Sequence, residues 1–280
     1  MQHRITTSAD GSSTLQLTRF NEAYHSTNGA YTEAMHIYIR CGVEHLLQKL
    51  LEAPLQRAGN TPPHIRIFDI GFGTALNCIL TYTWQQQLRQ EGLPHPRITY
   101  YGIEKYPIQP GEAKQLNYTS IIAQHANPHP DNLSETFTIM HTCPWEEDII
   151  LPPASGSVLH EKGGAIGPSG ISGKDTYAAP EFILHKSCAD IARLQAEFYR
   201  EAGTHAAPAV VFYDTFSPAT QPELWDEAIF RAIAAGCPTG SLLVTYCSKG
   251  AVKQALRNSG FTLERLPGPP GKRHILRGTL

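Results

Sequence analysis

The chain has 280 residues, of which 23 are lysine or arginine and 25 are aspartate or glutamate, so its formal net charge is −2 at pH 7. This length can bury a large core, and one α/β domain with additions is the simplest arrangement. A nearly neutral charge argues against a protein that grips nucleic acid mainly by bulk charge, although a local basic patch stays compatible with it.

The sequence carries no signal for a membrane, for secretion or for a metal. No apolar run approaches the ~18 residues of a membrane span, and the N-terminus is polar, without the apolar core of a signal peptide. The six cysteines are scattered without C-x-x-C spacing, as in a reducing compartment. His125 and His129 are four apart, but Pro128 and Pro130 prevent a shared helix face. We therefore expect a cytoplasmic protein without a membrane segment or a metal site.

The N-terminal part is expected to be an extension of the main domain. It begins with a polar, hairpin-like segment, followed by a stretch rich in Tyr, His, Glu and Asn around the turn Asn28–Gly29. That stretch is either a surface loop or a lid over a pocket. From Val43 to Leu55, apolar residues recur every three or four positions, which predicts an amphipathic covering helix. We expect residues 1–60 to form this extension and residues 61–280 the main domain.

The main domain opens with a strand and a glycine turn. Residues 65–74 read Ile-Arg-Ile-Phe-Asp-Ile-Gly-Phe-Gly-Thr, a short apolar run that predicts a buried strand. The two glycines permit positive φ or close approach of a ligand, and the helix predicted over 75–90 adds free N–H groups. A dinucleotide fingerprint fails because its third glycine position is Leu76. Asp69 would suit a cationic ligand such as S-adenosylmethionine; an ordinary strand-to-helix turn is the alternative.

Six more strands are predicted after this turn, with helical segments between most of them. An insertion near 150–180, rich in glycine and serine, is expected to be flexible, and 137–141 is expected to form an additional short strand. The last two of the six form an antiparallel pair. The pattern predicts a Rossmann-like, mostly parallel seven-stranded α/β sheet with an antiparallel C-terminal edge. The six strands are expected at 98–104, 181–190, 209–214, 241–247, 261–266 and 273–277.

Four of the predicted parallel strands end in an acid. Because the carboxyl ends of parallel strands meet at one edge of the sheet, we expect these acids to surround one ligand. The ligand cation would lie near Asp69, its ribose at Glu104, its base near Asp190, and its transferable group opposite Asp214. The residues predicted to bind the cofactor are Asp69, Gly71, Phe72, Gly73, Thr74, Glu104 and Asp190.

A second group of residues, after the strand 209–214, is predicted to act on the acceptor. Methyl transfer is an in-line displacement, and positioning alone can supply ~7–11 kcal/mol. Asp214 would orient an acceptor amine, and Phe216 would stack on a base or cover the forming cation. Pro218 completes the predicted catalytic residues. We expect positioning rather than general-base catalysis, because a strand-end aspartate is normally too weak a base at neutral pH.

These motifs together resemble the methyltransferase domain of the MnmC-like family, which forms 5-methylaminomethyl-2-thiouridine in tRNA. The similarity covers most of the chain except about 107–180, and Asp69 stands where the family often has glutamate. The matching stretches are Phe20–Tyr24, Gly29–Glu33, Asp69–Asn77, Tyr101–Glu104, Asp214–Pro218, Pro222–Trp225, Thr245–Gly250, Gly260–Phe261 and Gly271–Arg273.

The resemblance implies a class I, S-adenosylmethionine-dependent methyltransferase that acts on the aminomethyl group of the tRNA wobble uridine. It implies that Asp214 lies beside the acceptor amine and that Glu104 binds the ribose. Two-domain members also carry a flavin-dependent oxidase, so this chain is expected to be a stand-alone methyltransferase whose amine substrate comes from a separate flavin enzyme. The alternatives are a small-molecule or protein methyltransferase and a non-catalytic S-adenosylmethionine-binding module.

Basic residues gather in the last thirty positions, against a slightly acidic whole. They would contact RNA phosphates in a salt-sensitive manner, or simply form a solvated C-terminal face. With Glu33 from the N-terminal stretch, the predicted substrate-binding residues are Glu33, Lys249, Lys272 and Arg273.

Overall fold

The computed structural model describes residues 3–17, 22–52, 62–127, 129–154, 181–201 and 207–280. Its centre is an eight-stranded sheet with the order β10-β11-β9-β8-β4-β5-β7-β6. Five neighbouring strands, from β9 to β7, run parallel, whereas β10, β11 and β6 pair antiparallel with their neighbours. The strands are β4 (His64–Ile70), β5 (Arg97–Ile103), β6 (Asp148–Ile150), β7 (Phe182–Ser187), β8 (Ala209–Tyr213), β9 (Leu242–Thr245), β10 (Thr262–Pro267) and β11 (His274–Thr279).

This arrangement contains all seven strands predicted from the sequence and confirms the mostly parallel sheet with an antiparallel C-terminal edge. Two details of the prediction are wrong. The segment 137–141 belongs to helix α6 rather than to a strand, because Leu133, Phe137 and Met140 are spaced to bury one helical face. The eighth strand, β6, has only three residues, too short to show a strand period in the sequence.

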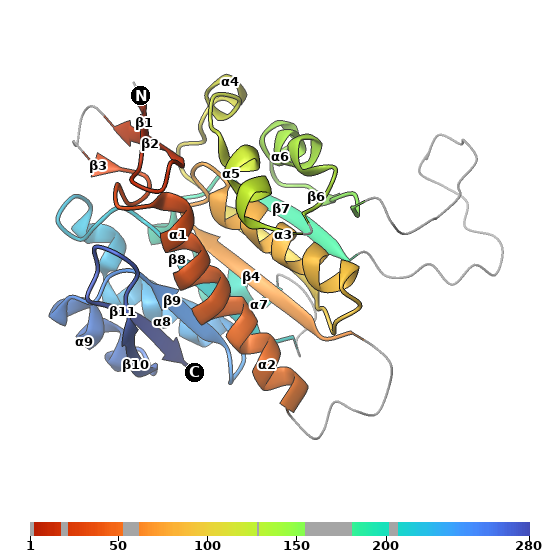
Figure 1. Ribbon diagram of the computed structural model, residues 1–280. Helices are drawn as coiled ribbons and strands as arrows, with labels where there is room; N and C mark the ends of the chain where they lie inside the picture. The colour runs from red at the N-terminus through yellow and green to blue at the C-terminus, as the bar shows by residue number, and fades with distance from the viewer. Residues whose placement is uncertain (1–2, 18–21, 53–61, 128, 155–180, 202–206) are drawn as a thin grey trace.

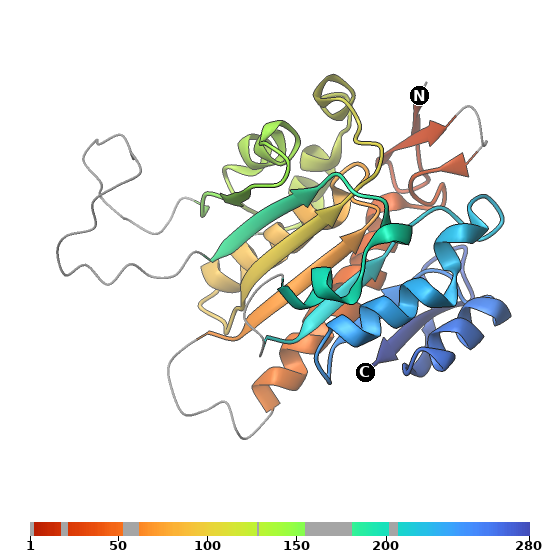
Figure 2. The same cartoon turned by 180° about the vertical axis from the view of Figure 1, so that it is seen from behind.

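Helices cover both faces of the sheet. On the face turned to the viewer in Figure 1 lie the N-terminal helix, α3, α5 and α6; Figure 2 shows α7, α8 and α9 on the opposite side. The helices are α1 (Ala30–Ala34), the π-helical segment η1 (Met35–Glu44), α2 (His45–Glu52), α3 (Leu76–Gln90), α4 (Pro110–Ala113), α5 (Tyr118–His125), α6 (Leu133–Thr142), η3 (Ile191–Arg193), α7 (Ala196–Glu201), η4 (Pro222–Trp225), α8 (Glu227–Gly236) and α9 (Gly250–Asn258).

Strand β4 shows why the core divides into two layers. Its side chains alternate, so that Ile65 and Ile67 join the cluster beneath the N-terminal helix and α3, whereas Phe68 and Ile70 join the cluster beneath α7 and α8. Both faces are therefore apolar, as expected for a central parallel strand.

The N-terminal helix is longer than predicted. It starts at Ala30 instead of Val43 and continues through η1 into α2. Gly42 in η1 lies directly over the sheet, where an added Cβ would come within 3.2 Å of Val244 and 3.3 Å of Phe212. The polar segment before it forms the expected hairpin, β1 (His3–Thr7) with β2 (Ser13–Leu17), to which β3 (Glu22–Ala23) adds a third antiparallel strand. The insertion predicted near 150–180 lies largely outside the described residues, from 155 onward.

None of the helices in the described part of the chain is long and apolar enough to span a membrane.

Candidate active site

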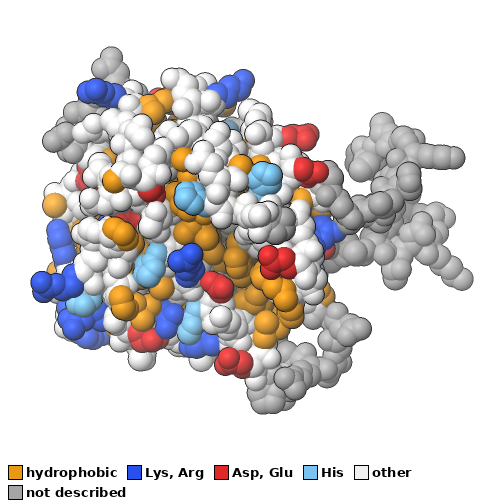
Figure 3. All heavy atoms as spheres, in the orientation of Figure 1, with side chains coloured by type: hydrophobic (Ala, Val, Ile, Leu, Met, Phe, Trp, Pro, Cys, Tyr) orange, Lys and Arg blue, Asp and Glu red, His pale blue; other side chains and the backbone are white. Residues whose placement is uncertain are grey.

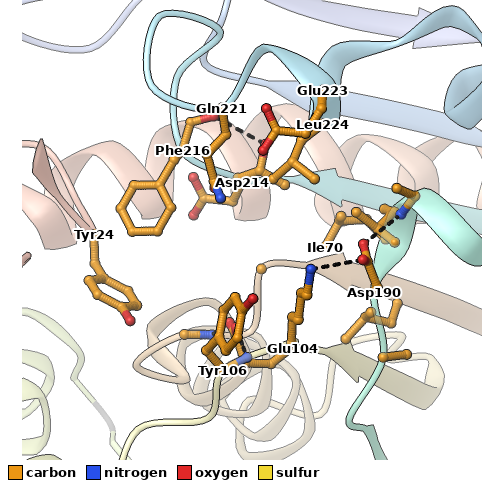
Figure 4. A pocket seen from close by; sticks show the side chains of 18 of the residues that line it. Tyr24, Ile70, Glu104, Tyr106, Asp190, Asp214, Phe216, Gln221, Glu223 and Leu224 are labelled. Atoms are coloured by element: carbon orange, nitrogen blue, oxygen red, sulfur yellow. Dashed lines mark hydrogen bonds and ion pairs between the residues drawn. The ribbon is translucent and has the colours of Figure 1, made fainter. Parts of the chain in front are cut away.

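A cavity of about 260 Å³ opens at the carboxyl edge of the sheet, where the strand order reverses between β4 and β8. Reversal points of this kind are where open α/β sheets bind ligands. Figure 4 shows Ile70 and Asp190 toward one end of the cavity, Tyr24 and Phe216 at the other, and Glu104 and Asp214 between them. The edge thus brings together residues that follow β4, β5, β7 and β8.

The glycine turn forms the floor of the cavity, and two of its residues cannot carry a side chain. Gly71 has φ +94°, and an added Cβ would lie 2.7 Å from the backbone oxygen of Asp214. Gly73 has φ +50°, and its Cβ would meet the Tyr24 ring at 3.0 Å. Both glycines line the cavity, so the backbone itself faces a ligand there.

Glu104 stands directly after β5 with its carboxylate held by the backbone. Its Oε2 accepts from the N–H of Gly73 at 3.1 Å and its Oε1 from the N–H of Tyr106 at 2.8 Å. Burial raises the pKa of this carboxyl, and the backbone donors oppose the rise. Each oxygen retains a second acceptor position, so the carboxylate can bind two further donors, such as a pair of ribose hydroxyls.

Asp190 follows β7 at the other end of the cavity. Its carboxylate accepts from Lys105 Nζ at 2.8 Å and from the N–H of Ala192 at 3.1 Å. Lys105 and Asp190 both line the cavity, so this ion pair forms part of its wall. The hydrogen bond from Lys105 lowers the pKa of Asp190, which keeps this end of the cavity charged but paired.

Asp214 follows β8 and is the most enclosed acid on the cavity wall. Asn77 Nδ2 donates to its Oδ2 at 3.0 Å, and His25 Nδ1 lies 4.0 Å from the same oxygen. Burial raises the pKa of Asp214 above its usual range. This carboxylate is therefore a stronger proton acceptor than an ordinary exposed aspartate.

His25 is held beside Asp214 by Thr74. The Tyr118 hydroxyl donates to Thr74 Oγ1 at 3.0 Å, and the same Thr74 Oγ1 lies within hydrogen-bond distance of His25 Nε2, at 2.6 Å. Burial lowers the pKa of His25 to about 4, so the ring is neutral at pH 7.

Aromatic side chains close the end of the cavity beside Asp214. Tyr24 and Phe216 meet edge to face, with ring centroids 5.3 Å apart. The loop that carries Phe216 is fixed from two sides: Trp225 Nε1 donates to the Phe216 carbonyl at 2.9 Å, and the Tyr246 hydroxyl donates to the Thr215 carbonyl at 2.9 Å. A planar group that enters here would contact a rigid aromatic wall.

Three residues that the sequence predicts as cofactor ligands do not line this cavity. Asp69 lies within β4, fully buried, where it accepts from the Tyr100 hydroxyl at 2.6 Å and faces Asn77 Nδ2 at 3.4 Å. The Phe72 ring packs onto Gly102, and the Thr74 hydroxyl serves His25. Asp69 does not line the cavity for a physical reason: a residue two positions before the turn still points into the core.

The predicted substrate-binding residues lie outside the cavity, in two different situations. Glu33 and Lys272 form an ion pair with each other, and the Lys272 ammonium also lies 5.0 Å from the Tyr246 ring. Lys249 and Arg273 are exposed. Figure 3 shows lysine and arginine side chains gathered over the region of α9, β10 and β11, at the lower left. Pro218 is half-buried in the loop after β8 and does not line the cavity.

Several cavity residues were not predicted from the sequence. Tyr24 and His25 line the wall from the N-terminal stretch, which agrees with its interpretation as a cover over a pocket. Lys105 and Tyr106 directly follow Glu104, a position that could have indicated them. Tyr106 is half exposed at the cavity. The sequence around His25 did not indicate that this residue belongs to the site, because its partners Thr74 and Asp214 lie 49 and 189 positions away.

Comparisons with known proteins agree with this geometry. A family model described as S-adenosyl-L-methionine-dependent methyltransferase matches residues 190–280. The bifunctional protein MnmC of tRNA 5-methylaminomethyl-2-thiouridine biosynthesis from Nitrosospira multiformis is 24% identical over 95% of this chain and 35% of its own length. The protein of the same name from Delftia acidovorans is 25% identical over 92% of this chain and 32% of its own length. The chain spans about a third of these relatives.

A solved structure gives the fold. The crystal structure of MNMC2 from Aquifex aeolicus matches with a TM-score of 0.62 at 20% identity, covering 100% of this chain and 70% of that one. The fold confirms the predicted Rossmann-like, mostly parallel sheet with an antiparallel C-terminal edge, and the family match over residues 190–280 agrees with the predicted class, the S-adenosylmethionine-dependent methyltransferases. The resemblance to MnmC-like methyltransferases is likewise confirmed and extends over nearly the whole chain.

Proposed function

We propose that this protein transfers a methyl group from S-adenosylmethionine to the aminomethyl nitrogen of the wobble uridine in tRNA. The observation that carries the proposal is the cavity in which Glu104 and Asp214 face one space across the glycine turn. Similarity to MnmC proteins over 92–95% of the chain supports the choice of substrate.

The cavity suits S-adenosylmethionine as donor. Glu104 would accept from the ribose hydroxyls, Asp190 and its partner Lys105 would flank the adenine, and the backbone of Gly71 and Gly73 would line the methionine part. The close approach of Gly71 to the Asp214 carbonyl supports this assignment, since only a glycine fits there and the backbone is left to face the ligand. When bound, S-adenosylmethionine supplies an electrophilic methyl group on a sulfonium.

Asp214 has the properties needed to receive the acceptor amine. Its carboxylate accepts a hydrogen bond from an amine N–H and thereby turns the nitrogen lone pair toward the donor end of the cavity. Because burial raises its pKa, Asp214 also withdraws a proton from an amine more readily than an exposed aspartate does. Asn77 holds the carboxylate in place from the protein side, and the His25 ring packs beside it, with Nδ1 4.0 Å from Oδ2.

The aromatic end and the basic surface fit a nucleotide substrate. Phe216, supported by Tyr24, would contact the uracil ring, with Pro218 shaping its loop. Lys249 and Arg273 would meet RNA phosphates, whereas the ion pair of Lys272 with Glu33 would brace the loop that carries Arg273. We also propose a cytoplasmic location, where tRNA is found, and a flavin-dependent activity that prepares the amine.

We also propose that residues 1–60 form an extension and residues 61–280 the methyltransferase domain. The hairpin, β3 and the long helix precede β4, which lies at the centre of the sheet.

The test is transfer of label from methyl-labelled S-adenosylmethionine to tRNA that carries the aminomethyl group without its final methyl. We expect label in tRNA with the wild-type protein and at least a hundredfold less with Asp214→Asn, whose affinity for S-adenosylhomocysteine stays within several-fold. Donor binding without label in tRNA would refute the proposal. Label in a small amine or a protein instead would support the alternative methyltransferase classes, and binding without any transfer would support a non-catalytic module.

A further inference from the structure

A second cavity lies on the other side of the glycine turn and has no role in the methyl transfer proposed above. It measures about 470 Å³ and shares Gly73 with the first cavity. Its other walls come from the loop after β5, the end of α6 and the segment that follows α6. Phe72, whose side chain is absent from the first cavity, forms part of this one.

The cavity contains a buried cation without a partner acid. Lys186 on β7 is 1% exposed, and its ammonium lies 4.6 Å from the centre of the Trp145 ring. In the part of the chain that the structure describes, no carboxylate comes within ion-pair distance of this ammonium. Burying an ammonium costs free energy unless an anion or hydrogen-bond acceptors compensate for the lost water. The contact with the Trp145 ring compensates for only part of this cost.

The acid whose backbone pairs with that of Lys186, Glu146, is occupied elsewhere. Glu146 accepts from Ser187 Oγ at 3.1 Å and from the N–H of Cys188 at 2.7 Å, and it lies 3.8 Å from His185. These contacts turn Glu146 away from the cavity. The positive charge of Lys186 therefore faces a space that has no negative protein group to balance it.

A second polar group in the same cavity also lacks a partner. His141 Nε2 is buried with no hydrogen bond among the described residues. Burial, followed by the charge of Lys186, lowers the pKa of His141 to about 4, so the ring is neutral at pH 7. One nitrogen of a neutral imidazole donates and the other accepts, so Nε2 can form one hydrogen bond with a bound ligand.

The apolar walls add a third element. The rings of Phe72 and Trp145 stand perpendicular, at 84° and 6.3 Å between centroids, and Phe72 lies 6.5 Å from His141. The cavity thus combines a site for an oxyanion, an imidazole nitrogen that can form one hydrogen bond with a ligand, and an aromatic corner. Its volume falls in the range of ligand pockets, roughly 300–1,000 Å³.

We propose that this second cavity, defined by Phe72, His141, Trp145 and Lys186, binds a nucleoside monophosphate unit, with the phosphate at Lys186 and the ring against the aromatic corner. A nucleotide has all three matching groups: an oxyanion, hydroxyl or imino donors, and a flat ring. The unit comes from a free nucleotide or from RNA, which present the same chemistry. The proposal does not depend on methyl transfer, because it concerns a different space.

Calorimetric titration with uridine 5′-monophosphate and with inorganic phosphate tests the proposal. Saturating S-adenosylhomocysteine is present so that the first cavity is blocked. We expect the nucleotide to bind at least tenfold more tightly than phosphate. Lys186→Met, which keeps the long apolar stem, should weaken nucleotide binding at least tenfold, whereas the control Lys49→Met, at an exposed lysine of α2, should leave it within twofold.

Each result of these titrations either supports or overturns nucleotide binding in the second cavity. Equal affinity for nucleotide and phosphate, no binding of either, or unchanged nucleotide affinity in Lys186→Met would overturn the proposal. If Lys186→Met does not fold, a crystal soaked with the nucleotide decides: phosphate oxygen at about 3 Å from Lys186 Nζ supports the site, and phosphate elsewhere refutes it. Comparison with a uridine dinucleotide identifies the source, since tighter binding of the dinucleotide indicates RNA and weaker binding indicates a free nucleotide.

Discussion

Replacement of Glu104 by glutamine examines the proposed donor site most directly. The wild-type carboxylate uses both oxygens toward backbone N–H groups, one from Gly73 at 3.1 Å and one from Tyr106 at 2.8 Å. Glutamine keeps the shape but has a single acceptor oxygen and no charge. One of the two N–H groups, and the ribose hydroxyl on the same side, would then face an NH₂ donor.

The expected loss follows from the strength of hydrogen bonds to a charged acceptor. Such a bond contributes about 1.5–3 kcal/mol, and the substitution removes one such bond to the ligand. The affinity for S-adenosylhomocysteine should therefore fall by roughly tenfold to 150-fold. Isothermal titration calorimetry measures this change, with Glu135→Gln, an exposed glutamate on α6, as the matched control.

The pH dependence gives the same prediction a second readout. Burial raises the pKa of Glu104, so acidification protonates it earlier than a free glutamate and removes its acceptor capacity. Wild-type affinity should decline as pH falls through this pKa, whereas Glu104→Gln should show a flatter profile. A variant that binds within twofold of wild type, with the same pH profile, would refute the assignment of the ribose to Glu104.

Three further predictions concern the glycine turn, His25 and the basic surface. Gly71→Ala should destabilise the fold by about 1–3 kcal/mol in denaturant titration and more than Gly92→Ala, because both have positive φ but only Gly71 has backbone within 4 Å of the added Cβ. The pKa of His25 is lowered to about 4, so between pH 4 and 6.5 the unfolded chain binds more protons than the folded one. The free energy of unfolding should therefore fall as pH falls through that window. His25→Gln should reduce this loss by up to about 3 kcal/mol. Equal acid sensitivity of the two proteins would contradict it. Lys249→Gln and Arg273→Gln should each lower the salt slope of tRNA affinity by about 0.7–0.9, and an unchanged slope would exclude phosphate contact.

The sheet was predictable because its signals are local. Each parallel strand is a short apolar run bounded by turn residues, and the acids after β5, β7 and β8 meet at one edge as the topology requires. Helix α6 was missed at 137–141 because the spacing of its buried residues becomes visible only over the whole helix, Leu133–Thr142. A five-residue window cannot distinguish a helix from a strand.

The site was less predictable, since its chemistry depends on contacts between distant parts of the chain. An acid two positions before a glycine turn can either face a ligand or point into the core, and the sequence does not distinguish the two. In the structure Asp69 is buried in β4, where the Tyr100 hydroxyl on the neighbouring strand donates a hydrogen bond to it. Lys272 was predicted as a free cation for RNA, but in the structure it is paired with Glu33. The sequence could not reveal this pairing, because the two residues are 239 positions apart.

The N-terminal segment is physically part of the site rather than an appendage to it. Tyr24 packs against Phe216 and occupies the space next to Gly73, and Glu22 accepts from the N–H of Ser217 at 3.0 Å. These contacts join the segment to the loop after β8, which carries the proposed acceptor-binding residues. The wall around Asp214 is therefore formed by two segments that lie far apart in the sequence, 195 positions in the case of Glu22 and Ser217. The shape of the acceptor end thus depends on how the N-terminal segment packs onto the sheet.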